Sequence, residues 1–191
     1  MLDGLIQWDK DLLVYLNSLG APKYDSFWLI ITRIDVWIPL FLLFGFLLFR
    51  KALRKTAWLQ LSFVLVFALF ITLLSKGVKI LTYRLRPCND PDINRFMRIL
   101  DTPHDFSFFS GHASSSFGIT MLMMLFLKDR YKWVAAFLVW PLLFAYSRLY
   151  LGVHFPLDVL VGGLVGVASA LLFYRYYQSL KVRETTSGHP E

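Results

Sequence analysis

The chain of 191 residues is too apolar for an ordinary soluble domain, since 57% of its residues are hydrophobic and only 17% are charged. Globular domains average about 45–50% apolar and about 25% charged residues. Both departures indicate a chain that is partly embedded in lipid, and they exclude disorder, collagen and coiled coil. The length allows about five to six membrane helices but no large soluble appendage. The net charge of +7 is not accompanied by a nucleic-acid-binding motif, so we expect no nucleic-acid partner.

The first 20 residues predict an amphipathic helix. Apolar residues recur there at helical spacing, and Asp9, Lys10 and Asp11 interrupt them. The apolar positions are Leu5, Trp8, Leu12, Leu16 and Leu19. We expect residues 1–20 to lie in the membrane interface, with a sixth span or a soluble cap as alternatives. The segment lacks the basic start and uninterrupted apolar core of a secretory signal, so we do not expect it to be cleaved.

Five long apolar segments follow, each near bilayer length. They cover residues 26–49, 57–74 with a less apolar continuation to 86, 112–127, 133–150 and 157–177. The runs are continuous rather than alternating, which excludes strands. The sequence therefore predicts one all-α domain over residues 1–191: an interfacial helix, an integral membrane bundle of five to six transmembrane helices in residues 21–178, and a cytoplasmic tail at 179–191. Gly162, Gly163 and Gly166 offer a small-residue surface for helix packing.

Basic residues predict the orientation. They cluster in three places that share one side of the membrane if there are five spans. These are Arg50, Lys51, Arg54 and Lys55; Lys128, Arg130 and Lys132; and Arg175, Lys181 and Arg183. The positive-inside rule makes that side cytoplasmic. The N-terminus, the connection 83–109 and the short turn 151–156 are then expected outside. Cys88 is the one cysteine and excludes an internal disulfide.

Three groups of polar residues stand at the predicted outer ends of the spans. The first is Lys79, Arg86 and Pro87. Seven residues separate the two cations, nearly two helical turns, so we expect both on one face of a helix that Pro87 ends. The alternative is that they reach out to lipid headgroups. Arg84 and Lys76 are expected to reach out to lipid headgroups too, or to contact the residues of the site rather than its ligand.

The second group is Ser110, Gly111 and His112, just before an apolar run. A serine in that position is a candidate N-cap, and Gly111 permits close approach of the backbone. A helix N-terminus with free N–H groups is a ready anion site. The alternative is a capped helix start with an incidental histidine.

The third group is Ser147, Arg148, His154 and Asp158. If a helix starts by His154, Asp158 shares its face and can accept from one imidazole nitrogen. If the helix begins at Pro156 instead, Asp158 lies in its first turn and can still reach back. A carboxylate fixes the tautomer of the histidine and leaves the other nitrogen as nucleophile or base. A purely structural pair is the alternative.

Together the three groups supply what phosphoryl transfer requires. The transition state spreads negative charge over the phosphoryl oxygens, which cations and helix N–H groups stabilise. Two histidines and an aspartate add a nucleophile, an acid and a residue that orients the nucleophile.

The three motifs, in this order, resemble the signature of the type-2 phosphatidic acid phosphatase family, K-x6-RP, PSGH and SR-x5-H-x3-D. They lie at residues 79–87, 110–112 and 147–158. One position departs, with Phe109 where the family usually has proline. No chemical group is lost by this change.

The resemblance implies that His154 attacks phosphorus to form a phosphohistidine, that Asp158 orients it, and that His112 protonates the leaving oxygen and then activates water. It assigns phosphate binding to a further set of residues and implies no metal and no cofactor. The set is Lys79, Arg86, Ser110, Gly111 and Arg148.

The implied function is that of an integral membrane lipid phosphatase, related to the haloperoxidases, with its site facing outward. Undecaprenyl or other polyisoprenyl pyrophosphate, phosphatidylglycerophosphate, phosphatidate and lipid A phosphate are the candidate substrates, and the bilayer is the expected partner. The loop from Pro87 to Phe109 is the expected headgroup reader. We expect a bacterial cytoplasmic membrane as location. A lipid-phosphate phosphotransferase and a non-catalytic lipid-binding or transport protein are the alternatives.

Overall fold

The computed structural model describes residues 2–186, and every regular element in that range is a helix. The α-helices are α1 (Leu2–Ser18), α2 (Asp25–Ile31), α3 (Ile38–Arg50), α4 (Arg54–Thr82), α5 (Gly111–Leu127), α6 (Val139–Tyr150) and α7 (Pro156–Thr186). The prediction of an all-α bundle is confirmed for these residues.

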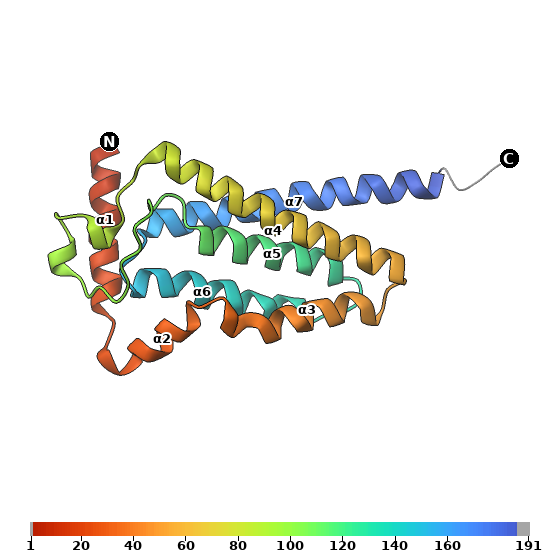
Figure 1. Cartoon of the computed structure of the whole chain (residues 1–191), viewed down its shortest axis with the longest axis horizontal. Coiled ribbons are helices and arrows are strands. Elements are labelled where there is room, and N and C mark those ends of the chain that lie inside the picture. Colours follow the sequence, from red (N-terminus) through yellow and green to blue (C-terminus); the bar gives the residue numbers. More distant parts are fainter. Residues whose placement is uncertain (1, 187–191) are drawn as a thin grey trace.

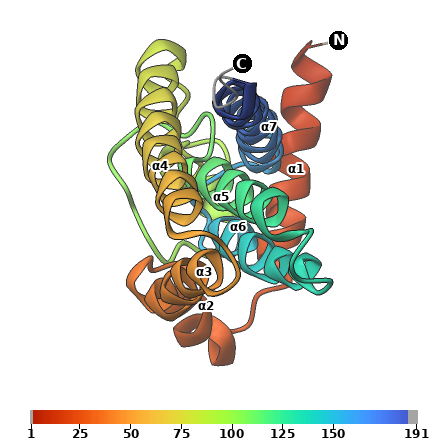
Figure 2. The ribbon, with the colours of Figure 1, turned by 90° about the vertical axis from the view of Figure 1, so that its right-hand side faces the viewer.

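Helix α5 lies at the centre of the bundle, in contact with α7, α4, α6 and α3 (Figure 2). The closest approach is between α5 and α7 and depends on two glycines. A Cβ at Gly162 would lie 2.6 Å from the carbonyl oxygen of Ser110, and one at Gly166 would overlap the backbone of Ser114. The predicted small-residue packing surface is thus confirmed, because only glycine permits this backbone contact.

The first predicted span, 26–49, is wrong as a single helix. It is broken into α2 and α3, which meet at a bend of 68°. Arg33 and Asp35 stand in the break as an exposed ion pair with 2.6 Å between nitrogen and oxygen. Adjacent charges that pair in water do not continue an apolar helix, which is the physical reason for the interruption.

Fewer helices are long and apolar enough to cross a membrane than the five to six that the sequence predicts. Among the described residues two segments qualify, Arg54–Asn89 and Pro156–Val182, and a third if the bent pair is one span. The apolar helix Gly111–Leu127 is shorter than these. At 1.5 Å per residue it rises about 26 Å, against roughly 30 Å of hydrocarbon. Leucines such as Leu69, Leu160 and Leu164 are exposed, as lipid contact requires.

The two ends of the bundle differ (Figure 1). One end carries α1, which lies crosswise to the long helices, together with the 83–110 connection and the 151–155 turn. The other carries the α3–α4 and α5–α6 connections and the end of α7, so the predicted basic clusters share one end. Of the predicted tail 179–191, residues 179–186 continue α7, and the rest lies outside the described residues.

Candidate active site

The start of α5 is capped as the sequence predicts. The hydroxyl of Ser110 accepts a hydrogen bond from the backbone N–H of Ala113 at 3.3 Å. The Ser110 backbone N–H in turn donates to the carbonyl of Asp158 at 2.9 Å. These two bonds fix the N-terminus of α5 against the first turn of α7, so the second and third sequence motifs meet.

The His154–Asp158 pair forms in the second of the two ways left open by the sequence. Helix α7 begins at Pro156, and Asp158 reaches back from its first turn. Its Oδ2 accepts from the backbone N–H of Phe155 at 3.0 Å and lies 3.4 Å from His154 Nδ1. Both side chains are buried, 1% and 0% exposed. The tight turn before them depends on Gly152, whose φ of 73° favours glycine.

The prediction that Lys79 and Arg86 share one helix face is wrong. Tyr83 adopts a left-handed conformation with φ 48° and ends α4, so Arg86 lies beyond the helix. A loop carboxylate brings the two cations together instead. Asp105 Oδ2 lies 2.6 Å from Lys79 Nζ, and its Oδ1 lies 2.6 Å from Arg86 Nη2.

Arg86 also fixes the protonation of the buried histidine. Its Nη1 donates to the carbonyl of Val153 at 2.8 Å and lies 3.1 Å from His154 Nε2. A guanidinium has only donors, so Nε2 of His154 must be the acceptor and the proton must be on Nδ1. His154 therefore presents a lone pair toward the cations while its N–H faces Asp158.

Arg148 is buried and incompletely paired. Its Nη1 donates to Thr32 Oγ1, and its Nη2 lies 3.9 Å from Asp101 Oδ2. Within residues 2–186 its buried Nε has no hydrogen-bond partner. A buried donor without an acceptor is costly in free energy, so this position favours an oxygen-rich ligand.

Two pKa shifts follow from this arrangement. Burial, and then the charges of Arg86 and Arg148, lower the pKa of His154 well below 6.5, so the histidine is neutral at neutral pH. Burial raises the pKa of Asp105, but hydrogen bonds and charge from Lys79 and Arg86 outweigh it and bring the value to about 2. The site thus combines a neutral histidine with an ionised carboxylate.

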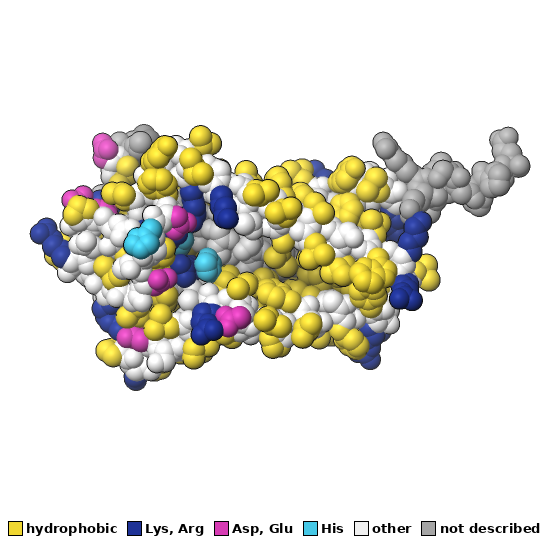
Figure 3. Space-filling model, in the orientation of Figure 1, with side chains coloured by type: hydrophobic (Ala, Val, Ile, Leu, Met, Phe, Trp, Pro, Cys, Tyr) yellow, Lys and Arg dark blue, Asp and Glu magenta, His cyan; other side chains and the backbone are white. Residues whose placement is uncertain are grey.

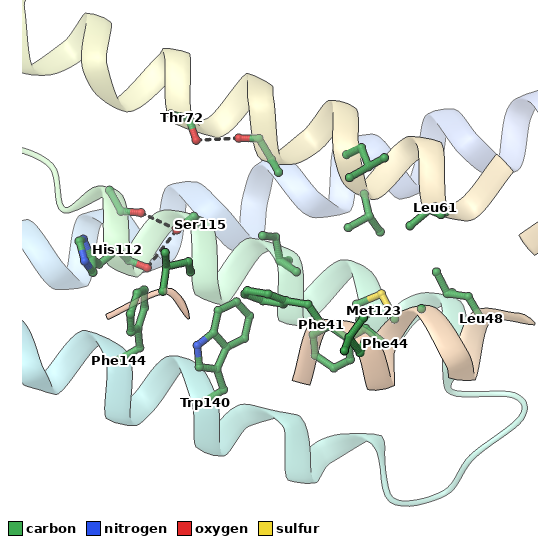
Figure 4. Close-up of a pocket in the computed structure, with 18 residues that line it drawn as sticks. Phe41, Phe44, Leu48, Leu61, Thr72, His112, Ser115, Met123, Trp140 and Phe144 are labelled. Atoms are coloured by element: carbon green, nitrogen blue, oxygen red, sulfur yellow. Dashed lines mark hydrogen bonds between the residues drawn. The ribbon is translucent and has the colours of Figure 1, made fainter. Parts of the chain in front are cut away.

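An apolar groove leads away from the polar end of the bundle. It is a cavity of about 630 Å³ between α3, α4, α5 and α6. His112 and Ser115 stand at one end of it, and Phe41, Leu48 and Met123 lie farther along (Figure 4). The His112 ring packs on Phe144 with 4.7 Å between centroids. Figure 3 shows the same division, with acidic and histidine side chains gathered at one end, Lys and Arg side chains at both ends, and hydrophobic side chains along the face between them.

Two carboxylates of this region are not among the predicted site residues. Asp105 lies in the loop between Pro87 and Phe109, outside the three motifs. Asp9 interrupts the apolar pattern of α1, yet it is fully buried and bonded to Arg84. Its helical spacing with Leu13 and Asn17, which are also buried, was the available signal. In the part of the chain that the structure describes, no three His, Cys, Asp or Glu side chains form a group that could hold a metal ion.

A buried histidine–carboxylate pair, a cluster of cations and a capped helix N-terminus lie together at one end of this helical membrane protein, and phosphoryl transfer is the chemistry that such a set of groups suits. The PAP2 superfamily profile matches residues 57–181. The chain is 30% identical to the lipid A 4′-phosphatase of Bacteroides thetaiotaomicron over 96% of this chain and 83% of that protein. The chain therefore belongs to the PAP2 superfamily, as the sequence motifs indicated, and is a membrane-embedded phosphatase.

Two further similarities agree with this assignment. The chain is 33% identical to the undecaprenyl-diphosphatase of Sulfolobus acidocaldarius over 81% of this chain and 64% of that protein. Its fold matches the PAP2-type phosphatidylglycerolphosphate phosphatase of Bacillus subtilis with a TM-score of 0.72. That match has 24% identity and covers 92% of this chain and 87% of the other.

Proposed function

We propose that this protein hydrolyses a lipid phosphate or pyrophosphate at the outer membrane face through a phosphohistidine on His154. The observation that carries the proposal is the distance of 3.1 Å between Arg86 Nη1 and His154 Nε2. Because a guanidinium can only donate, this contact assigns the lone pair of His154 to Nε2. A neutral imidazole with its N–H toward Asp158 is the form that can attack phosphorus. The apolar groove beside His112 supports a lipid as the leaving group.

The proposed reaction has two steps. His154 Nε2 forms a bond to the terminal phosphorus as the bond from that phosphorus to the leaving oxygen breaks. The leaving oxygen is the ester oxygen of a lipid monophosphate or the bridging oxygen of a pyrophosphate, and protonated His112 gives it its proton. His112 then removes a proton from water, whose oxygen attacks phosphorus and breaks the phosphorus–nitrogen bond. Inorganic phosphate leaves, and both histidines return to their starting forms.

The phosphate is proposed to lie among the cations. Lys79, Arg86 and Arg148 would hold its oxygens, with the hydroxyl of Ser110 and the backbone of Gly111 at the start of α5. The unpartnered Nε of Arg148 supports this assignment. Charge that spreads over the phosphoryl oxygens in the transition state is stabilised most by donors already held in place.

A phosphate monoester on a lipid A type of headgroup is the first candidate substrate. The support is the similarity to a lipid A 4′-phosphatase over 96% of this chain. Polyisoprenyl pyrophosphate is the second candidate, because of the 33% identity to an undecaprenyl-diphosphatase and because the groove beside His112 is apolar and suits an isoprenoid chain. Phosphatidate and phosphatidylglycerophosphate complete the set to be compared.

The test is phosphate release from these four lipids by purified protein in detergent with EDTA present. Wild type is expected to release phosphate from at least one lipid and to form a phosphoenzyme that survives an alkaline quench. The His154→Ala variant is expected to do neither. Undiminished release by that variant would exclude the histidine nucleophile. Addition of lipid alcohols as acceptors separates hydrolysis from phosphotransfer, because a transferase would make new phosphorylated lipids.

We further propose that the protein lies in a bacterial cytoplasmic membrane with its site outside. Single cysteines introduced in a Cys88→Ala background test this orientation. Arg95→Cys is at the end with the site, and Lys132→Cys is at the end with the basic connections; both positions are exposed. An impermeant thiol reagent added to whole cells is expected to label only the first, and the reverse pattern would overturn the orientation.

A further inference from the structure

The inner face of α1 is polar in a way that an interfacial helix does not require. Asp9, Leu13 and Asn17 form a buried stripe along it, each no more than 1% exposed. Asn17 anchors the end of the helix, since its Nδ2 donates to the carbonyl of Tyr150 at 2.9 Å and its Oδ1 accepts from the Arg98 backbone at 2.7 Å. Asp9, at the other end of the stripe, is a carboxylate that must be paired to be buried.

Both oxygens of Asp9 are used, and both lead toward the site. Its Oδ1 accepts from the backbone N–H of Leu157 at 2.8 Å, in the first turn of α7. Its Oδ2 lies 2.6 Å from Arg84 Nη2. The same guanidinium donates from Nη1 to Asp158 Oδ1 at 2.6 Å. A continuous chain of contacts therefore runs from α1 through Arg84 to the carboxylate beside His154.

Arg84 can hold Asp158 only if its own orientation is fixed. Its guanidinium lies over the Phe155 ring at 4.0 Å. Its backbone carbonyl accepts from Ser107 at 2.9 Å. The planar fork then bridges two carboxylates, and a guanidinium is the side chain that does this with two donors in fixed geometry. Without Asp9, Arg84 would be held toward Asp158 by one ion pair and could turn.

We propose that Asp9 is a positioning residue for the reaction, acting through Arg84 on Asp158 and so on the orientation of His154. The inference rests on the proposed histidine nucleophile. It gives the N-terminal helix a part in turnover, because α1 supplies the outermost member of the chain of contacts. Misplacement of a reacting group by about 1 Å can cost on the order of 100-fold in rate.

The test compares Asp9→Asn, Arg84→Gln and the double variant by kcat and KM for the preferred lipid. Asp9→Asn is expected to lower kcat at least tenfold with KM unchanged within about twofold, since the nucleophile and not the phosphate site is disturbed. Because Asp9 acts through Arg84, the double variant is expected to be no slower than Arg84→Gln. Multiplied losses in the double variant, or an unchanged kcat in Asp9→Asn, would overturn the proposal.

Two control variants on the same helix separate positioning from stability. Asp11→Asn removes an exposed carboxylate that bonds only locally, to Gln7 at 2.8 Å, and is expected to change nothing. Asn17→Ala removes the anchor of α1 and is expected to lower the melting temperature while kcat per folded molecule stays the same. A loss of kcat in Asn17→Ala equal to that in Asp9→Asn would contradict a specific role for Asp9.

Two further measurements keep the outcomes distinct. If Asp9→Asn gives no folded protein, Arg84→Lys takes its place, because lysine keeps the charge but cannot bridge both carboxylates. A tenfold or greater loss of kcat at unchanged KM is then expected, and full kcat overturns the proposal. His154→Ala is measured beside them. If it stays active, the proposed mechanism fails; if it is inactive while Asp9→Asn is fully active, only the positioning role fails.

Discussion

Asp105 accepts two hydrogen bonds from Arg86 at one oxygen, 2.6 Å from Nη2 and 3.1 Å from Nε. Its other oxygen lies 2.6 Å from Lys79 Nζ. One loop carboxylate thus pairs with two of the three cations proposed to hold the phosphate. A phosphate that takes the same donors must displace Asp105 from them.

Asp105→Asn is therefore expected to strengthen anion binding. Without the carboxylate, inorganic phosphate should inhibit at about tenfold lower concentration, because one close charge interaction is worth about 1.4 kcal/mol when partly buried. The side chain of Asp105 is 56% exposed, so the loss of stability should stay below about 1 kcal/mol. Inhibition assays and thermal unfolding measure the two effects.

The pH of that comparison matters. The pKa of Asp105 is about 2, below its ordinary 3.8, so the stability from its pairing is complete above pH about 4 and is lost as pH falls through about 2. Assays at pH 7 therefore measure the full effect. Asp129→Asn, at the opposite end of the bundle, is the matched control and should leave inhibition unchanged. Equal inhibition constants for wild type and Asp105→Asn would contradict the displacement.

On the acid side of the pH–rate profile, kcat/KM is expected to decrease only below pH 6.5. Burial, with Arg86 and Arg148, lowers the pKa of His154, so the neutral form of this proposed nucleophile persists as pH falls. A pH–rate profile from pH 4 to 9 checks this, and a limb above pH 6.5 assigned to His154 would be inconsistent with its surroundings.

The same shift predicts how stability depends on pH. The unfolded chain binds a proton at His154 near pH 6.5, whereas the folded chain does not. The free energy of unfolding should therefore decrease below pH about 6.5, by up to about 1.4 kcal/mol per pH unit from this group. His154→Ala should make the decrease shallower. Melting temperatures in detergent at pH 7 and pH 5 measure the difference.

Gly166→Ala should prevent close packing of α5 on α7. The added Cβ would overlap the backbone of Ser114, and rigid backbone cannot yield as a flexible side chain can. We expect a loss of at least about 3 kcal/mol, or no folded protein. Gly77→Ala is the control in another helix, since nothing lies within 4 Å of its Cβ position. It should be neutral or stabilising by up to about 1 kcal/mol. Equal melting temperatures for Gly166→Ala and Gly77→Ala would contradict this packing.

Gly45→Phe should obstruct the apolar groove. Gly45 lines the cavity, and nothing lies within 4 Å of its Cβ position, so the new ring can extend into the empty space. KM for the long-chain lipid is expected to rise about tenfold, because buried apolar contact with the chain is lost. Turnover of a short, water-soluble phosphate ester should not change. Gly77→Phe, outside the groove, is the control. An unchanged KM for the long-chain lipid would show that the chain does not lie there.

Much of this fold could be predicted because the signals were local. Continuous apolar runs indicated membrane helices, Ser110 marked the start of α5, and the glycines of α7 marked its packing surface. Each depends on residues within a few turns of one another. The break between α2 and α3 was harder to predict. Arg33 and Asp35 interrupt the run 26–49, but the apolar residues on both sides of them favour a continuous helix.

The candidate site, too, was predictable only where its signals were local in the sequence. Composition and the long apolar runs determined a helical membrane protein, and the resemblance of three motifs indicated its family, with His112, His154 and Asp158 in the expected order along the chain. The tertiary structure decided which groups pair. Asp9 is 75 positions from Arg84 in the sequence, and Asp105 meets Arg86 only because Tyr83 ends α4. Burial and charge pairing depend on how distant segments pack together, which no local pattern of residues encodes.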